Sequence, residues 1–482
     1  MEEWRELWAS WEAVTLGMVP KGQLLSKPID LRNPCIFYLG HIPTFLDSIV
    51  VRAMHCQPTE PRHYLDIFQR GIDPDVDDPT QCHQHSALPG SWPELDEILD
   101  YQKRVRERLE SLYCHGTASR QPPDVQRAIW TAFEHEAMHL ETLLYMLLQA
   151  DTTLPPPNVI IPDFVSGKTS ERQKEAPEGG PWVKVPAMTL DVGLDDPEDP
   201  EDPTPHFFGW DNEKPVRSGV VVPEFTVRTH PITNEEYACY LEAQSSTKLP
   251  ASWTLADSHG SSGSSGSSGN GAASFSDRIC IRTVFGPVPL KLALDWPAIA
   301  SYDELAGCAE WMHYKIPTAN QVRAVYRYSD DMGMATIEKK QSKKIDAVNG
   351  FLPPQFICQP LECLMTGEKN RHLIHNGVSE SPPKAAAHRR PEREEEGSRD
   401  VLSRARDKLF SSTSCGNVGF KHWHPTSVCA SGGKLLGRGE TGGAWEWTST
   451  VLSPHPGFKP AKLYPEYTGT HQPLFIGEEN GS

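Results

Sequence analysis

Two histidines four residues apart are the strongest chemical signal in the sequence. His135 and His139 lie in a segment from about Pro123 to Gln149 whose apolar residues recur at helical spacing. Side chains at positions i and i+4 of a helix leave the same face about one turn apart. Two imidazoles in this arrangement can chelate one divalent metal ion.

The same stretch also fits a plainer interpretation. Glu134, Glu136 and Glu141 surround the two histidines, and acidic residues in such numbers are typical of a solvated helix face. The spacing alone therefore leaves a metal site and a charged surface as alternatives.

A third histidine favours the metal site. His41 follows an apolar run over residues 36–39, and we expect it at the head of a helix that continues through residues 44–51. Metal ligands in helical bundles come from facing helices. Three neutral nitrogens would leave coordination positions open for substrates, which is typical of catalytic rather than structural sites. A helix-capping or core histidine is the alternative for His41.

The length and charge of the chain narrow its class. A chain of 482 residues predicts two or three domains. The net charge of −18 argues against nucleic acid as a partner. The start of the chain does not resemble a signal peptide and no apolar run reaches transmembrane length, so we expect no membrane partner. Eleven scattered cysteines without a CxxC pair indicate reduced thiols and a cytoplasmic location, with the nucleus as an alternative.

Helical periodicity dominates residues 1–156. Apolar stripes predict four helices, near the N-terminus, around His41, over residues 93–112 and over the segment with His135 and His139. We therefore predict a four-helix bundle with a metal ion in its interior. Residues 157–181 are rich in Pro, Ser, Lys and Glu and lose this periodicity, which indicates a linker.

Residues 182–470 have a different pattern. Four short β-like runs alternate with turns (183–185, 188–192, 219–222 and 225–227). Thr233 or Asn234 is expected to cap a helix, and the glycine- and tryptophan-rich residues 442–449 suit a tight strand. Insertions near 256–275 and 335–410 are predicted to be disordered, and 471–482 form a divergent tail.

The order of motifs resembles the ergothioneine-biosynthesis sulfoxide synthases. The motifs that carry the resemblance are Gly40-His41, His135-Glu136-Ala137-Met138-His139, Gly209-Trp210-Asp211-Asn212-Glu213, His230-Pro231-Ile232-Thr233-Asn234, Asn417-Val418-Gly419-Phe420 with Trp423-His424-Pro425, and Gly442-Gly443 with Trp445-Glu446-Trp447-Thr448. The resemblance implies a multidomain chain that is α and then α+β. A DinB-like four-helix bundle would precede a domain of the formylglycine-generating, C-type-lectin-like fold with long loops. The match is strongest to the synthase half of fused fungal-type proteins, whose other half is a histidine methyltransferase.

The resemblance also implies an activity. Family members bind a non-haem ferrous iron through three histidines, here His41, His135 and His139. They join a cysteine sulfur to the imidazole of hercynine, consume O2 and leave a sulfoxide. A tyrosine supplies a proton or hydrogen atom, and a second one three residues on contacts hercynine; Tyr464 and Tyr467 match this spacing. The fused fungal type favours cysteine over γ-glutamylcysteine as the thiol.

Departures from the family pattern leave other functions open. The tail lacks the family's Gly-Gly-Ser-Trp strand and Asn-Trp segment, so we expect a C-terminally truncated chain with little synthase activity. Met138 stands where some bacterial-type relatives have glutamine. The alternatives are a DinB-type, zinc-dependent thiol transferase and a non-catalytic remnant. A formylglycine-generating enzyme is rejected, because it needs a reactive cysteine pair after Trp447 and the last cysteine is Cys429.

Overall fold

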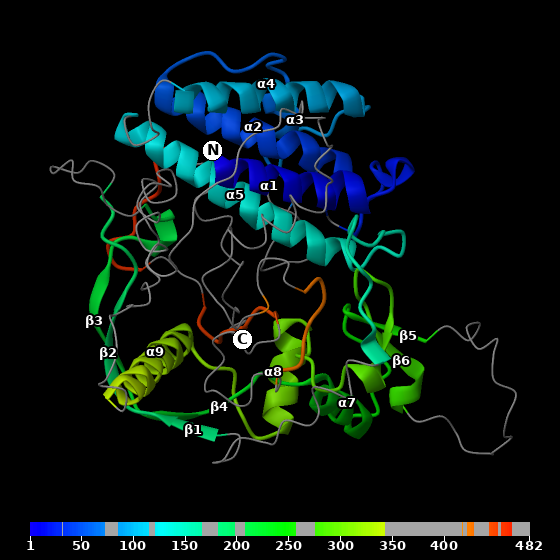
Figure 1. Cartoon of the computed structure of the whole chain (residues 1–482), viewed down its shortest axis with the longest axis vertical. Helices are drawn as coiled ribbons and strands as arrows, with labels where there is room; N and C mark the ends of the chain where they lie inside the picture. Colours follow the sequence, from blue (N-terminus) through cyan, green and yellow to red (C-terminus); the bar gives the residue numbers. More distant parts are fainter. Residues whose placement is uncertain are drawn as a thin grey trace, which may run out of the picture.

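Among the described residues, five α-helices form the N-terminal part of the protein. The computed structural model of the chain describes residues 1–30, 32–72, 85–114, 121–165, 182–197, 208–256, 275–342, 417, 422–428, 443–451 and 455–464. The helices are α1 (Glu2–Glu12), α2 (Cys35–Met54), the short α3 (Tyr64–Phe68), α4 (Leu95–Cys114) and α5 (Pro123–Leu147). They pack together at one end of the molecule, and α5 faces the later part of the chain (Figure 1).

One apolar core holds these helices together. On α1, α4 and α5 its members recur at three- and four-residue spacing, so one face of each of these helices enters the core, whereas α2 is buried on nearly all sides from Cys35 to Asp47. They include Trp4 and Trp11 of α1, Phe37 and Phe45 of α2, Ile98 and Tyr101 of α4, and Ile129 and Leu143 of α5, each at most 2% exposed. The predicted helical bundle is therefore present, with α3 as an addition that the periodicity did not reveal.

Helix α2 lies in the middle of the bundle and packs against α3, α4 and α5. Among the described residues it is the helix long and apolar enough to cross a membrane, but 83% of its apolar window is buried inside the protein. Its apolarity therefore matches a core helix. The sequence led us to place His41 at the head of this helix, which is wrong. The helix begins at Cys35, because the apolar run over residues 36–39 gains burial as its first turns.

The described residues of the later part form three small antiparallel sheets. Strand β1 (Trp182–Val185) pairs with β4 (Phe225–Arg228), β2 (Met188–Val192) pairs with β3 (Arg217–Val222), and β5 (Trp253–Leu255), β6 (Ile279–Ile281) and β7 (Val288–Pro289) form a third sheet. The four strands predicted from the sequence are confirmed as β1 to β4. The helices of this part are α7 (Asn234–Ala243), α8 (Tyr302–Trp311) and α9 (Ala319–Ser342).

The sequence predicted some of the element boundaries in this part correctly and others incorrectly. The Thr233 side chain caps α7 in a reciprocal pair with Glu236, which confirms the predicted cap. The described residues 443–451 contain no strand, contrary to prediction; Trp445 is 55% exposed and the Trp447 indole donates to the carbonyl of Ala300 at 3.0 Å. This segment is thus held by a bond to a distant part of the same chain and not by the backbone ladder of a strand. Helix α9 extends to Ser342, past the expected start of an insertion at 335.

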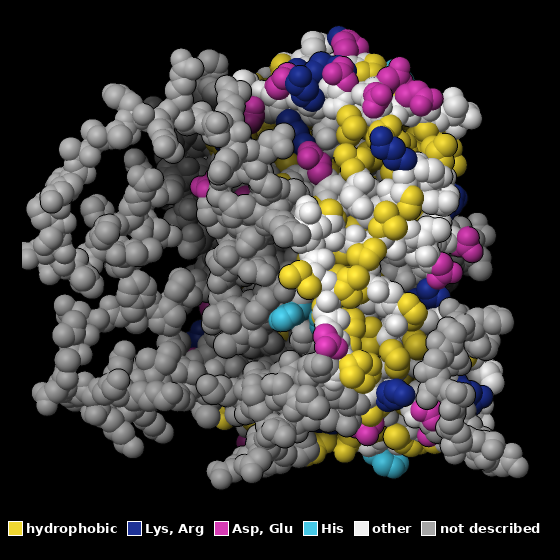
Figure 2. Space-filling model, turned by 45° about the vertical axis from the view of Figure 1, so that its right-hand side comes forward, with side chains coloured by type: hydrophobic (Ala, Val, Ile, Leu, Met, Phe, Trp, Pro, Cys, Tyr) yellow, Lys and Arg dark blue, Asp and Glu magenta, His cyan; other side chains and the backbone are white. Residues whose placement is uncertain are grey.

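The charge of the surface is uneven on the face that Figure 2 shows. Acidic and basic side chains gather at the end where α4 lies, while apolar side chains continue down the face below them. Several of the charges on α4 pair with each other or with neighbours, such as Arg104 with Asp100 and Arg106 with Glu12. The exposed side of α4 therefore carries several ion pairs.

Candidate metal centre and the adjoining tyrosine

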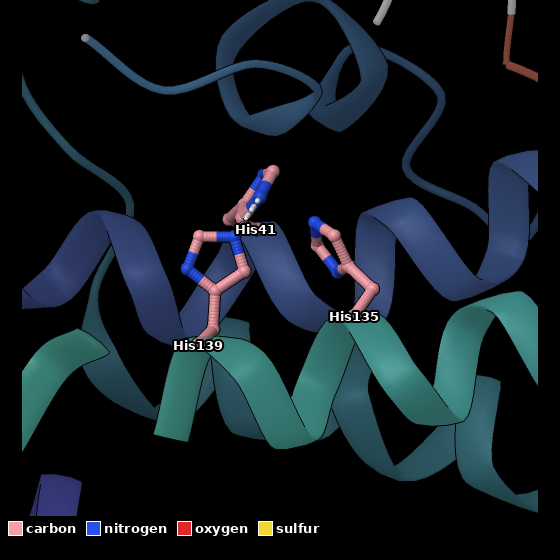
Figure 3. Close-up of side chains that lie close together, drawn as sticks. All are labelled: His41, His135 and His139. Atoms are coloured by element: carbon pink, nitrogen blue, oxygen red, sulfur yellow. Dashed lines mark hydrogen bonds between the residues drawn. The ribbon is translucent and has the colours of Figure 1, made fainter. Parts of the chain in front are cut away.

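The three candidate histidines meet in the interior of the bundle. His41 comes from α2, His135 and His139 come from α5, and the three rings point toward one another (Figure 3). One possible ligand atom from each lies within 4.8 Å of the others. The side chains of His41 and His135 are 2% and 4% exposed. The structure therefore brings together all three residues that the sequence selected.

A backbone carbonyl orients the ring of His41. Its Nδ1 lies 2.6 Å from the carbonyl oxygen of Phe68, at the end of α3. A carbonyl oxygen can only accept, so Nδ1 carries a proton and Nε2 is the nitrogen that can offer a lone pair to a metal. Metal-binding histidines are commonly oriented by such a bond on the nitrogen that does not face the metal. This bond thus holds His41 with Nε2 directed toward the other two rings.

The glycine before His41 makes this bond possible. A Cβ atom placed on Gly40 would lie 2.6 Å from the ring of Phe68, far closer than side-chain atoms pack. The absence of a side chain lets α3 approach α2 closely enough for the Phe68 carbonyl to reach the imidazole. The Phe37 ring stacks on His41 at 5.1 Å between centroids and completes its apolar surroundings.

Aromatic packing orients the other two histidines. The His135 ring stacks on Phe45 of α2 with 3.7 Å between centroids and 13° between planes. The Tyr38 ring lies 5.9 Å from that of His139. Apolar walls of this kind limit access of water and lower the local dielectric, which strengthens charge interactions inside the site.

The neighbouring glutamates do not all lie on a solvated face, since Glu141 is exposed whereas Glu136 is buried. Glu136 is 2% exposed, and burial raises its pKa to about 7 although the charge of Arg106 opposes the shift. Burial, with the charge of Glu213, raises the pKa of Glu134 to about 7 as well. The interpretation of this stretch as a charged surface is therefore wrong at Glu136, because that carboxyl lies inside the bundle.

The donor set fits a divalent transition metal. Imidazole nitrogens suit iron, zinc, copper and nickel, whereas magnesium and calcium prefer oxygen ligands. The Nε2 atoms of His41 and His139 are 3.2 Å apart. Two nitrogens that each lie about 2.1 Å from one ion, at an angle of about 100°, would be separated by roughly that distance. The cluster can therefore bind a metal through three neutral ligands.

Tyr464 is buried against the end of the bundle that α2 and α5 form. Its side chain is 5% exposed, and its ring lies 5.4 Å from that of Trp210, which in turn packs 5.9 Å from Trp130 of α5. On the other side, the guanidinium of Arg52 in α2 donates to the carbonyl of Leu463. The later part of the chain thus delivers this tyrosine to the two helices that carry the histidines.

The distance along these helices can be estimated from residue spacing. His41 meets His139 and Phe45 meets His135, so α2 and α5 run antiparallel at the site. Arg52 lies further along α2 and Trp130 lies earlier on α5, both on the same side of His135. At a rise of 1.5 Å per residue, the Tyr464 segment lies roughly 8–10 Å along the pair from His135. Its role in chemistry stays a prediction, and Tyr467 lies outside the described residues.

Sequence reasoning missed a buried ion pair that joins the two parts. Both terminal nitrogens of Arg127 in α5 donate to the carboxylate of Asp196, the second at 2.6 Å, and the two side chains are 7% and 0% exposed. The Asp196 carboxylate also accepts from the backbone N–H of Gly209 at 2.9 Å. Burial alone would raise the pKa of Asp196, but the bonds and charge of Arg127, with the N–H of Gly209 and the charge of Lys214, hold that pKa below its ordinary value.

The helical part of the chain, which carries the three histidines, resembles a known family. Residues 2–143 match the DinB superfamily. The chain is homologous to "Ergothioneine biosynthesis protein 1" of Neurospora crassa, with 45% identity over 480 residues, which is 97% of this chain and 52% of that protein. A protein of the same name from Schizosaccharomyces pombe is 26% identical over 499 residues, covering 100% of this chain and 51% of the relative. The chain spans about half the length of these relatives.

Proposed function

We propose that this chain acts in ergothioneine biosynthesis as an iron-dependent sulfoxide synthase. The reaction joins one C–H carbon of the hercynine imidazole to the thiol sulfur of cysteine. One C–H and one S–H bond break, one C–S and one S–O bond form, and O2 takes up four electrons. One oxygen atom enters the sulfoxide, and the other leaves as water with the two hydrogens.

The buried three-histidine cluster is the observation that carries this proposal. Neutral ligands leave the full positive charge of a ferrous ion available, and three of them leave positions open for the thiol and O2. The names of the two relatives supply the pathway. The formylglycine-generating-like fold of residues 182–470 belongs to the same proposal; the small antiparallel sheets and the capped helix α7 are compatible with it.

In this proposal the histidines position the metal and the second part of the chain controls the proton. His41, His135 and His139 would hold Fe2+, which would supply the activation of O2. The Tyr464 hydroxyl supplies a proton or hydrogen atom to the reacting groups. Its oxygen accepts a hydrogen bond from the backbone N–H of Asp211 at 3.1 Å. An amide N–H only donates, so the phenol proton points away from Asp211.

Tyr464→Phe tests the assignment of the tyrosine. The variant should retain iron and bind hercynine as the unaltered protein does, because it loses only a hydroxyl. The ratio of coupled sulfoxide to cysteine sulfinate should fall at least roughly tenfold, as general acids typically contribute that much or more. Tyr314→Phe, at a side chain 41% exposed, is the matched control. An unchanged product ratio in Tyr464→Phe would refute the role.

The zinc-dependent thiol transferase remains the competing function, because imidazole ligands also suit zinc. Metal analysis of protein purified without oxygen, followed by turnover with Fe2+ or Zn2+, separates the two. Sulfoxide formation with iron and none with zinc is expected. Thiol transfer that proceeds with zinc and without O2 would replace the proposal.

A further inference from the structure

One aspartate contacts the Tyr464 segment at two points. Asp211 is 5% exposed and belongs to the short helical turn Asp211–Glu213. Its backbone N–H donates to the Tyr464 hydroxyl at 3.1 Å, and its side-chain carboxylate accepts from the backbone N–H of Ala461 at 3.3 Å. These two bonds span both ends of residues 461–464, which lie in neither a helix nor a strand.

We propose that Asp211 is a positioning residue that sets where the Tyr464 hydroxyl lies and which way its proton points. This inference rests on the proposed function, in which Tyr464 takes part in the reaction. Asp211 belongs to the motif Gly209-Trp210-Asp211-Asn212-Glu213, one of those that carry the family resemblance. The contacts of Asp211 give this motif a specific task.

The segment depends on such a clamp because it has no ladder of its own. A helix or strand fixes a side chain through repeated backbone bonds, whereas residues 461–464 are fixed by bonds to groups far away in sequence. Asp211 holds one side of the segment, and Arg52 of α2 holds Leu463 from the other. The Trp210 ring, at 60° to that of Tyr464, limits rotation of the phenol.

The turn that carries Asp211 is itself fixed to the helix of the metal site. The backbone N–H of Trp210 donates to the Glu213 carboxylate at 2.9 Å, which closes the turn. The backbone N–H of Gly209 binds Asp196, and Asp196 binds Arg127 of α5. His135 and His139 are on the same helix. Asp211 therefore places Tyr464 relative to the helix that carries two of the three candidate ligands.

Two substitutions separate the bond from the charge. Asp211→Ala removes the acceptor for Ala461 but keeps the backbone N–H, so the segment should loosen. Asp211→Asn keeps an oxygen acceptor in the same place and should retain the position of the segment. Asp191→Ala is the matched control, because its exposed carboxylate also accepts from a backbone N–H, that of Gly219 in β3, without a bond to Asp211 or Tyr464.

The decisive measurement uses 3-fluorotyrosine at position 464 in the metal-free, full-length protein. Its ¹⁹F resonance should move toward that of free 3-fluorotyrosine in Asp211→Ala and stay in place in Asp211→Asn and Asp191→Ala. Circular dichroism and metal stoichiometry should be unchanged in all three. In the iron-loaded unlabelled variants, Asp211→Ala should lower the ratio of sulfoxide to sulfinate in the same direction as Tyr464→Phe.

Each contrary result has a distinct meaning. A resonance that does not move in Asp211→Ala overturns the positioning role, whatever the activity. Equal displacement in Asp211→Asn and Asp211→Ala overturns the acceptor bond to Ala461 as its basis. A displaced resonance, together with an unchanged product ratio in Tyr464→Phe, supports the positioning by Asp211 and refutes the chemical role of the tyrosine.

Discussion

The three histidines and Tyr464 are held in place by different kinds of structure. The histidines project from two long helices whose own backbone bonds and shared core fix them. Tyr464 projects from an irregular segment whose position depends on bonds to Arg52 and Asp211, 411 and 250 residues away from their partners. Helices give precision through local bonds, whereas the irregular segment obtains it through long-range contacts. Changes at the contacts between the two parts of the chain should leave the histidines in place, whereas they should displace Tyr464.

Removal of a histidine should have the largest effect and should leave Tyr464 in place. His135→Ala deletes one of three ligands, so retention of Fe2+ after anaerobic loading and desalting should be lost. The matched control is His63→Ala, at an exposed histidine of the same bundle. Metal analysis checks the result, and full stoichiometric iron in His135→Ala would rule out the assignment.

Breaking the buried ion pair should lower the stability of the protein and leave the histidine site nearly unchanged. Arg127→Met leaves the carboxylate of Asp196, which is 0% exposed, without its bidentate partner. Removal of one partner of a buried pair costs about 3–5 kcal/mol. Denaturant unfolding should show this loss, while metal affinity should change little. Arg127→Met with Asp196→Leu should recover part of the stability. A loss of metal binding as severe as in His135→Ala would contradict the view that the helices alone hold the histidines in place.

A side chain at Gly40 should damage the histidine site alone. Gly40→Ala forces a Cβ against the Phe68 ring and displaces the carbonyl that orients His41. Overpacking of this kind costs about 1–3 kcal/mol. Metal affinity should fall, and the added substitution Phe68→Leu should restore part of it. Gly22→Ala, where a Cβ meets nothing within 4 Å, is the control. Equal affinity in Gly40→Ala and Gly22→Ala would contradict the role of this close approach.

The smallest effect should appear in acid. The pKa of Asp196 is lowered in the folded state, so its contribution to stability is fully present above the ordinary value of 3.8 and is lost as pH falls through the folded value. Unfolding free energies measured from pH 6 downward should therefore fall more steeply below pH 4 for the unaltered protein than for Asp196→Asn. Parallel curves would show that folding does not lower the pKa of Asp196. Asp191→Asn serves as the control.

Features set by local sequence could be predicted, whereas features set by long-range contacts could not. The spacing of His135 and His139 is a local property of one helix, and the four short strands and the Thr233 cap are also local, so each could be predicted. The third ligand required a facing helix, and its place within α2 was wrong because burial extended that helix toward its start. The pair of Arg127 and Asp196 joins residues 69 apart and left no local pattern. Tyr464 was selected as a candidate through the family resemblance, because no periodicity in the sequence points to it.

The distance in sequence between the two supports also sets an order during synthesis. The last helix of the bundle ends at Leu147, so all three histidines have left the ribosome long before Tyr464 is made. At about 5–20 residues per second, the intervening chain takes roughly 15–60 s to translate. A helical bundle can fold well within that time. The three histidines can therefore come together as a candidate metal site before Tyr464 has been synthesised.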